Sequence, residues 1–361
     1  MSALDLVSEA GTSIWLDDLS RDRLDSGSLA SLIASSCVVG VTTNPSIFSA
    51  AISKSDKYLA DIKELSTGGA TVDDIVTRLT TDDVRAACDL FLDTYRRTQG
   101  IDGRVSIEVE PNLAYNTEGT VARALELHSI VNRPNVLIKV PATLEGLPAI
   151  EELTARGISI NVTLIFSVSR YEAVFDAYLR GLERRLGNGL ALNEIHSVAS
   201  FFVSRIDTQV DKELDTNAPG SPLRGTAAIA NAHLAYESFL RITQSTRWQK
   251  LAAAGAQLQR PLWASTGVKD KSYDSTRYVV ELIAPSTVNT MPEATLDEVR
   301  AHGQVRGDTI TSEIARARQI FDELAAAGID IGSITAALED AAVAGFSKAW
   351  DELLTNVKAA M

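Results

Sequence analysis

The stretch NVLIKVPAT, residues 135–143, places one charged side chain, Lys139, inside a short apolar run. A run this short and this rich in β-branched residues is typical of a strand that is buried on both faces of a parallel sheet. Burial disfavours the charged form of a lysine, and a neutral amine can attack a carbonyl carbon to form a Schiff base. The alternative is a structural lysine at the strand end, whose ammonium group reaches solvent or an ion partner. The residues of the other strands distinguish a reactive lysine from a structural one.

Short strand-like runs alternate with helical segments along most of the chain. We predict eight strands, in the segments that begin SIWLDD at Ser13, VVGVTTNPS at Val38, VSIEVEP at Val105, VLIKVPA at Val136, SINVTLIF at Ser159, HSVASFFV at His196, PLWASTG at Pro261 and YVVELIAP at Tyr278. Helices are indicated between them by amphipathic spacing, by a glycine stop at Gly157 and by a serine cap at Ser167. Repeated strand–helix units demand a parallel sheet, and eight units predict an α/β fold, a closed (β/α)8 TIM barrel.

The chain of 361 residues is longer than the roughly 250 residues that such a barrel needs. The surplus falls in the helical stretch 52–99, in the polar insert DKELDTNAPGSPLRG at 211–225, and in a helical C-terminal segment, 309–361. No linker rich in Pro, Gly or Ser separates a second domain. We therefore expect a single barrel domain over residues 1–361, with additional helices and a helical C-terminal extension.

The charge balance excludes two classes of partner. With 34 basic and 47 acidic residues the formal net charge is −13, which argues against a nucleic-acid-binding protein or an anionic-membrane surface. An anionic substrate must therefore be held by local donors.

Other features indicate a cytoplasmic protein. Cys37 and Cys88 lie in unrelated segments without metal or redox spacing, as expected of free thiols in a reducing compartment. The N-terminal residues carry acids where a signal peptide needs basic and apolar regions, and no apolar run approaches the ~20 residues of a membrane span.

Polar side chains share one face of several predicted strands, because strand periodicity is two. These sets are Ser106, Glu108 and Glu110; Asn161 and Thr163; Thr42 and Asn44; and His196 and Ser200, with Asp17 at the end of the first strand. The outward positions must be apolar to bury helices, so we expect the polar groups and Lys139 to point inward near the C-terminal mouth of the barrel. Each has a structural alternative: Asp17 as a helix cap, Asn44 as a turn residue before Pro45, and Glu108 as a mere ion partner of Lys139. Their co-occurrence on successive strands favours a site, because a buried ion pair is by itself a poor stabiliser.

A lysine nucleophile with two carboxylates and several hydroxyl or amide donors suits carbon–carbon bond chemistry through an iminium electron sink. No metal or other cofactor is needed for such a reaction. The four histidines, at positions 128, 196, 233 and 302, have no spaced partner that would indicate a metal site.

Several motifs show that the chain resembles the transaldolases, class I Schiff-base aldolases, in their longer bacterial form. The matching motifs are WLDDLSRDRL, GVTTNPSIF, VSIEVEP, VLIKVPAT, GISINVTLIFS, SVASFFVSRID and LWASTG, followed by VELIAPSTVNTMPEAT over an eighth strand and its loop. TTNPS and LIKVPAT are the specific ones, and together the motifs span most of the chain.

The resemblance implies roles for individual residues. Lys139 would form the Schiff base with the ketone of a ketose phosphate, and Asp17 would be the acid/base that removes and returns the hydroxyl proton. Glu108 and Thr163 would hold a catalytic water. Three further residues would bind the hydroxyls of the dihydroxyacetone unit: Asn44, Asn161 and Ser200.

The phosphate end departs from the family pattern. Arg205, in FFVSRID, would clamp the substrate phosphate, because its forked donors suit that anion. Shorter transaldolases follow the serine of the seventh strand with an arginine two residues later, whereas this chain reads ASTGVKDK. Ser265 and Lys269 are the expected replacements, with Thr266 a lesser candidate.

The function implied by the resemblance is a transaldolase of the non-oxidative pentose phosphate pathway. It would transfer a dihydroxyacetone unit from sedoheptulose 7-phosphate or fructose 6-phosphate to glyceraldehyde 3-phosphate or erythrose 4-phosphate, as a cytoplasmic monomer or homodimer. Three alternatives stay open: a fructose 6-phosphate aldolase that releases free dihydroxyacetone, a pyridoxal phosphate enzyme with the cofactor on Lys139, and a non-catalytic sugar-phosphate-binding barrel.

Overall fold

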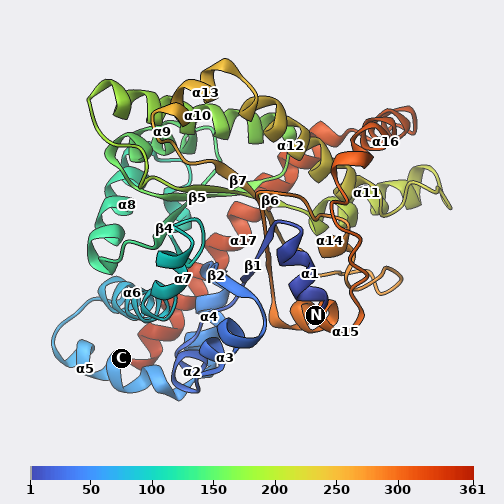
Figure 1. Cartoon of the computed structure of the whole chain (residues 1–361). Helices are drawn as coiled ribbons and strands as arrows, with labels where there is room; N and C mark the ends of the chain where they lie inside the picture. The colour runs from blue at the N-terminus through green and yellow to red at the C-terminus, as the bar shows by residue number, and fades with distance from the viewer. Residues whose placement is uncertain (1) are drawn as a thin grey trace.

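Eight parallel strands close into a barrel in the computed structural model, which describes residues 2–361 (Figure 1). The strands are β1 (Thr12–Leu16), β2 (Val38–Val41), β3 (Arg104–Glu108), β4 (Val136–Pro141), β5 (Ile160–Ile165), β6 (Ser197–Phe202), β7 (Gln259–Ala264) and β8 (Thr287–Met291). Each strand pairs with the next in sequence, and β8 pairs with β1 to close the sheet. The predicted (β/α)8 TIM barrel with additional helices is confirmed.

Helices surround the barrel, and further helices precede the first strand and follow the last one (Figure 1). They are α1 (Ala3–Glu9), α2 (Arg21–Asp25), α3 (Ser28–Ser35), α4 (Pro45–Lys54), α5 (Leu59–Thr67), α6 (Val72–Leu90), α7 (Leu92–Arg97), α8 (Thr117–Val131), α9 (Gly146–Arg156), α10 (Val168–Gly187), α11 (Ser204–Asn217), α12 (Ala227–Thr243), α13 (Thr246–Ala253), α14 (Arg277–Val280), α15 (Glu293–His302), α16 (Ile314–Ala326) and α17 (Ile331–Ala360). Three short 3₁₀ helices are η1 (Asp56–Tyr58), η2 (Pro111–Leu113) and η3 (Thr311–Glu313). None of the helices formed by residues 2–361 combines the length and the apolar character that a membrane span requires.

The sequence signals for helix ends act as expected around β5. The hydroxyl of Ser167 accepts a hydrogen bond from the backbone N–H of Arg170 and so caps the start of α10. Gly157 ends α9 in the left-handed conformation, with φ of 91°, which a residue without Cβ adopts at little cost.

The predicted eighth strand is wrong. Residues 278–285, YVVELIAP, form most of α14 and the turn after it, and the strand that closes the barrel is TVNTM, residues 287–291. A short apolar run does not distinguish a buried helical turn from a buried strand. The polar insert is also shorter than predicted, because its first half, residues 211–217, continues α11.

The register of the barrel places Lys139 between two polar neighbours. Lys139 on β4 lies opposite Glu108 on β3 and opposite Asn161 on β5. All six residues of β4 are buried, as predicted for a strand covered on both faces. Lys139 therefore lies in the barrel wall with its polar neighbours at the same level.

The long C-terminal helix α17 runs across the barrel as the red helix of Figure 1. It contacts α4, η2 and α11, which follow β2, β3 and β6 respectively. These elements stand at the carboxyl ends of their strands, where barrel enzymes hold their active sites. The C-terminal extension therefore covers the catalytic end of the barrel.

Candidate active site

A cavity of about 250 Å³ opens at the carboxyl ends of the strands. Seven of the ten residues predicted for the site line it: Asp17, Asn44, Lys139, Ser200, Arg205, Ser265 and Lys269. These residues come from five strands or the segments that directly follow them. Strand parity predicted the convergence of Asp17, Asn44, Lys139 and Ser200, whereas Arg205, Ser265 and Lys269 came from the motif resemblance. His196, which has the same parity as Ser200, does not join them, because it precedes β6 at the amino end of the strand.

Lys139 is only 4% exposed at the base of this cavity. Its Nζ lies 3.1 Å from Oε2 of Glu108 and donates a hydrogen bond to the backbone oxygen of Thr43 at 3.0 Å. The ring of Phe346 lies on another side, with its centroid 5.9 Å from Nζ. The amine is thus held in one place by one carboxylate, one carbonyl and one aromatic ring.

Two carboxylates flank the lysine, and burial raises the pKa of both. For Glu108 and for Asp17 the loss of solvation is the main cause, and the nearby charge of Lys139 acts in the opposite direction. Asp17 also accepts a hydrogen bond of 2.6 Å from the hydroxyl of Thr42. Carboxylates with raised pKa values accept and return protons near neutral pH more readily than exposed ones.

A hydrogen-bonded chain of side chains crosses the barrel interior beside the lysine. Ser200 donates to Oδ1 of Asn161 at 2.6 Å, and Nδ2 of Asn161 donates to the hydroxyl of Ser106 at 3.0 Å. These bonds orient the amide and the serine. The buried hydroxyl of Thr163 forms no hydrogen bond within residues 2–361.

Asn44 has a structural role in addition to its place in the cavity. Its side-chain oxygen accepts a hydrogen bond from the backbone N–H of Ile47 at 3.1 Å and caps α4, in which Pro45 is the first residue. The alternative of a purely local role, as a turn residue before Pro45, is therefore partly correct for Asn44. The cap fixes the amide at the cavity wall, where Asn44 also lines the site.

Two cations that line the cavity, Arg205 and Lys269, form no ion pair with a carboxylate in the part of the chain that the structure describes. Burial lowers the pKa of Arg205, and burial together with the charge of Arg205 lowers the pKa of Lys269. Between them Ser265 has a φ of 56° and shares a hydrogen bond of 3.1 Å with the hydroxyl of Ser204. Thr266, the lesser candidate, points away, since its hydroxyl donates to the backbone oxygen of Thr290.

The structure adds Thr290, Phe202 and Phe346 to the residues predicted for the site, and it also places Thr42, which strand parity had indicated, in the cavity wall. Thr42 and Thr290 share a hydroxyl hydrogen bond of 2.6 Å beside Asp17, and both line the cavity. Phe202 and Phe346 supply its apolar wall. The parity of VVGVTTNPS indicated Thr42, whereas Phe346 comes from α17 and carries no local signal for a site.

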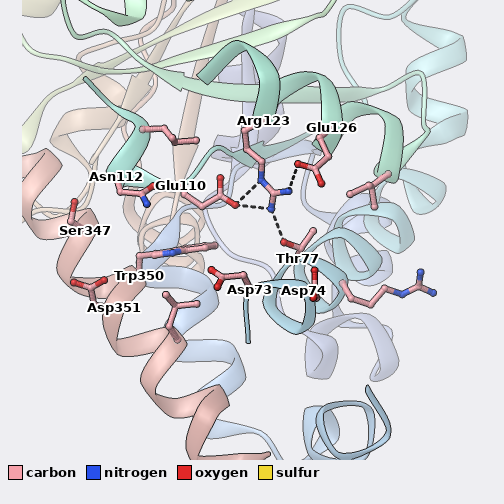
Figure 2. Close-up of a pocket in the computed structure, with 14 residues that line it drawn as sticks. Asp73, Asp74, Thr77, Glu110, Asn112, Arg123, Glu126, Ser347, Trp350 and Asp351 are labelled. Carbon is pink, nitrogen blue, oxygen red and sulfur yellow. Dashed lines mark hydrogen bonds and ion pairs between the residues drawn. The ribbon is translucent and has the colours of Figure 1, made fainter. Parts of the chain in front are cut away.

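Glu110 does not join the site, although it has the same parity as Glu108. Strand β3 ends at Glu108, and the side chain of Glu110 pairs with Arg123 of α8, whose Nη2 lies 2.6 Å from Oε1 (Figure 2). This ion pair lines a separate cavity between α6, α8 and α17. The alternation of faces predicts direction only while the strand continues.

Comparison with known proteins gives a consistent result. The family model Transaldolase/Fructose-6-phosphate aldolase matches residues 14–357. The transaldolase of Saccharopolyspora erythraea is 56% identical over 357 residues, which cover 99% of this chain and 97% of that protein. The transaldolase of Mycolicibacterium smegmatis is 55% identical over 350 residues, 96% of this chain and 94% of its own. The transaldolase of Mycobacterium tuberculosis is 54% identical over 356 residues, 98% and 95% of the two chains.

Proposed function

The chain belongs to the transaldolase/fructose-6-phosphate aldolase family and is an enzyme of the transaldolase type, and we propose that it transfers a dihydroxyacetone unit between sugar phosphates through a Schiff base on Lys139. The donor is sedoheptulose 7-phosphate or fructose 6-phosphate, and the acceptor is an aldose phosphate such as erythrose 4-phosphate or glyceraldehyde 3-phosphate.

One observation carries the proposal. The buried Lys139 amine lies 3.1 Å from Glu108, in a cavity that is also lined by the carboxylate of Asp17 and by the unpaired cations Arg205 and Lys269. A nucleophile, two proton carriers and a phosphate-binding end are the parts that a Schiff-base reaction on a sugar phosphate requires.

Imine formation uses Lys139 and Glu108. The neutral amine attacks the ketone carbon C2 of the donor, and the resulting carbinolamine loses its hydroxyl group as water to leave an iminium ion. Glu108, beside Nζ, takes and returns protons in these steps through a water that it holds with Thr163. Its raised pKa and the free hydroxyl of Thr163 support these roles.

Carbon–carbon cleavage uses Asp17. Its carboxylate takes the proton of the C4 hydroxyl while the C3–C4 bond breaks. The electron pair of that bond forms the C2–C3 double bond of an enamine, and the electron pair of the C=N double bond moves onto the nitrogen. The shortened aldose phosphate leaves. When an acceptor aldehyde binds, the enamine carbon attacks it, Asp17 returns the proton to the new hydroxyl, and hydrolysis of the new imine frees Lys139.

The remaining residues bind the sugar. The Asn161–Ser200 pair and Asn44 lie where the hydroxyls of the three-carbon unit would be held next to Lys139. Arg205 and Lys269 bind the phosphate with charge-assisted hydrogen bonds, since neither cation pairs with a carboxylate among the described residues 2–361. The anion would thus supply the charge compensation that these buried cations lack.

Borohydride reduction in the presence of fructose 6-phosphate tests this proposal directly. We expect mass spectrometry to find a three-carbon adduct on the peptide that contains Lys139. With erythrose 4-phosphate present, the enzyme should transfer the unit rather than release free dihydroxyacetone. An adduct on a different lysine would contradict the proposal, and rapid release without an acceptor would favour the aldolase alternative.

Phe346 of the C-terminal helix should favour transfer over release. Its ring covers the Lys139 amine and is 6% exposed, so it limits the access of water to the enamine and iminium carbons. We predict that Phe346→Ala raises the ratio of dihydroxyacetone release to transfer by about tenfold. The measurement is free dihydroxyacetone formed from fructose 6-phosphate, with and without erythrose 4-phosphate.

Trp350→Ala is the matched control. Trp350 is on the same helix, one turn further on, but it lines the separate cavity near Glu110 (Figure 2). It should leave the ratio unchanged. If the two variants changed the ratio equally, the effect would come from loosening of α17 and not from the ring over Lys139.

A further inference from the structure

A second cavity, of about 260 Å³, lies at the opposite end of the barrel. Arg104 is the first residue of β3, Arg260 is the second residue of β7, and His196 directly precedes β6; all three line this cavity. It therefore stands at the amino ends of the strands, whereas the Lys139 site stands at their carboxyl ends. Nothing in the transferase mechanism uses these residues.

Arg104 is 1% exposed, and none of the carboxylates of residues 2–361 forms an ion pair with it. Its Nε donates to the backbone oxygen of Gly100 at 2.7 Å, and Nη1 donates to that of Pro134 at 3.2 Å. Its Nη2 is buried and meets no hydrogen-bond acceptor within residues 2–361. One face of the guanidinium lies 4.9 Å from the ring centroid of Tyr95. A buried charge-bearing donor is costly unless it is paired.

The surrounding charges leave one positive charge uncompensated. Asp102, a carboxylate at this end, is occupied: Arg260 lies 2.9 Å from its Oδ1, and Ser13 and Trp15 also donate to it. Two guanidinium groups thus share one carboxylate. Burial lowers the pKa of Arg104 to about 10 and that of His196 to about 3, and in both cases the neighbouring Arg260 acts in the same direction.

Two side-chain nitrogens of the cavity wall lie close together. A Cβ atom placed on Gly100 would lie 2.9 Å from Nε2 of His196 and 3.0 Å from Nη2 of Arg104, so the two nitrogens are neighbours, and the N–H tautomer of His196 that bears the proton on Nε2 would donate beside Arg104. Ser197, which also lines the cavity, accepts a hydrogen bond from Gln259 at 2.8 Å and retains its own O–H to donate. This donor set can bind an acceptor that carries negative charge.

We propose that this cavity binds a small tetrahedral oxyanion of the phosphate type. The planar fork of an arginine matches the spacing of phosphate oxygens, and charge-assisted hydrogen bonds of this kind are stronger than neutral ones. The anion supplies the missing negative charge beside Arg104. In a chain with a net charge of −13, such a site depends on these local donors and not on the overall field.

The test uses the ring signals of His196 as the reporter, because the chain has four histidines and their NMR signals can be assigned by substitution. The background is Arg205→Ala, in which the phosphate end of the catalytic site is weakened. Inorganic phosphate should shift the His196 signals in a saturable manner, with no comparable shift at His128. Glycerol 3-phosphate, added separately, distinguishes a site for the free ion from a site for a phosphorylated metabolite.

Arg104→Met in the same background should abolish the shift. Arg123→Met is the matched control, because that arginine pairs with Glu110 in a distant cavity and its loss should leave the shift intact. Should Arg104→Met fail to fold, crystals of the otherwise unmodified chain soaked in selenate give an independent measure, with an anomalous peak expected beside Arg104. Unchanged His196 signals in phosphate, or a cavity without an anomalous peak, would overturn the proposal.

Discussion

Lys139→Met should lower transaldolase turnover by on the order of 10⁴-fold or more, because it removes the nucleophile on which every covalent intermediate depends. Methionine retains the unbranched length of the side chain, so we expect the barrel to stay folded. Loss of the ammonium also removes the charge that lowers the pKa of Glu108 and Asp17, and Glu108 should therefore take up a proton. The measurements are transfer activity and borohydride trapping with fructose 6-phosphate.

Lys269→Met is the control for this variant. It removes a second lysine from the same cavity without removing the nucleophile. We expect it to retain the three-carbon adduct on Lys139 and to raise KM for sugar phosphates. A borohydride adduct in Lys139→Met, on any other lysine, would show that the Schiff base forms elsewhere.

Asp17→Ala should separate imine formation from bond cleavage. Lys139 and Glu108 remain, so the donor should still form a Schiff base. Without the carboxylate that takes the C4 hydroxyl proton, turnover should fall by roughly 10²–10⁴-fold. Borohydride should now trap the whole six-carbon ketose phosphate, and mass spectrometry should find this larger adduct in place of the three-carbon one.

Asp18→Asn is the control for this variant, because it removes the neighbouring carboxylate instead of that of Asp17. Asp18 forms an ion pair with Arg23, at 2.6 Å, and does not line the cavity. It should give the three-carbon adduct at the rate of the unmodified chain. If Asp17→Ala did the same, Asp17 would not be the acid/base.

Seven of the eight strands could be predicted from the sequence. A strand that is buried on both faces appears in the sequence as a short continuous apolar run, and seven of the strands carry such a run. The polar residues that interrupt these runs at alternate positions indicated the candidate site. Asn161, Thr163 and Ser200 were found in this way, since a strand that continues keeps every second side chain on one face. The prediction of Ser265 and Lys269 depended on the family resemblance, because residues in a loop do not alternate between two faces.

The eighth strand and Glu110 show where this reasoning fails. TVNTM carries little apolar signal because Thr287 and Asn289 meet partners inside the protein: Thr287 bonds to Thr12, and Asn289 bonds to the backbone oxygen of Tyr278. The YVVELIAP run is more apolar than TVNTM, so the apolar pattern predicts the eighth strand there. Glu110 lies beyond the last paired residue of β3, where the strand period no longer applies.

The amino-acid sequence was enough to predict the barrel, the buried lysine that we propose forms the Schiff base, and the polar residues on the neighbouring strands, because backbone periodicity and burial are local properties of the chain. The contact of Phe346 with Lys139 could be known only from the folded structure, since the two residues are far apart in sequence and meet through the packing of α17 across the mouth. The same holds for Arg104, His196 and Arg260, which share one cavity beside the Arg260–Asp102 ion pair. Compensation of a buried charge depends on every group around it in space, and closure of the barrel sets those neighbours.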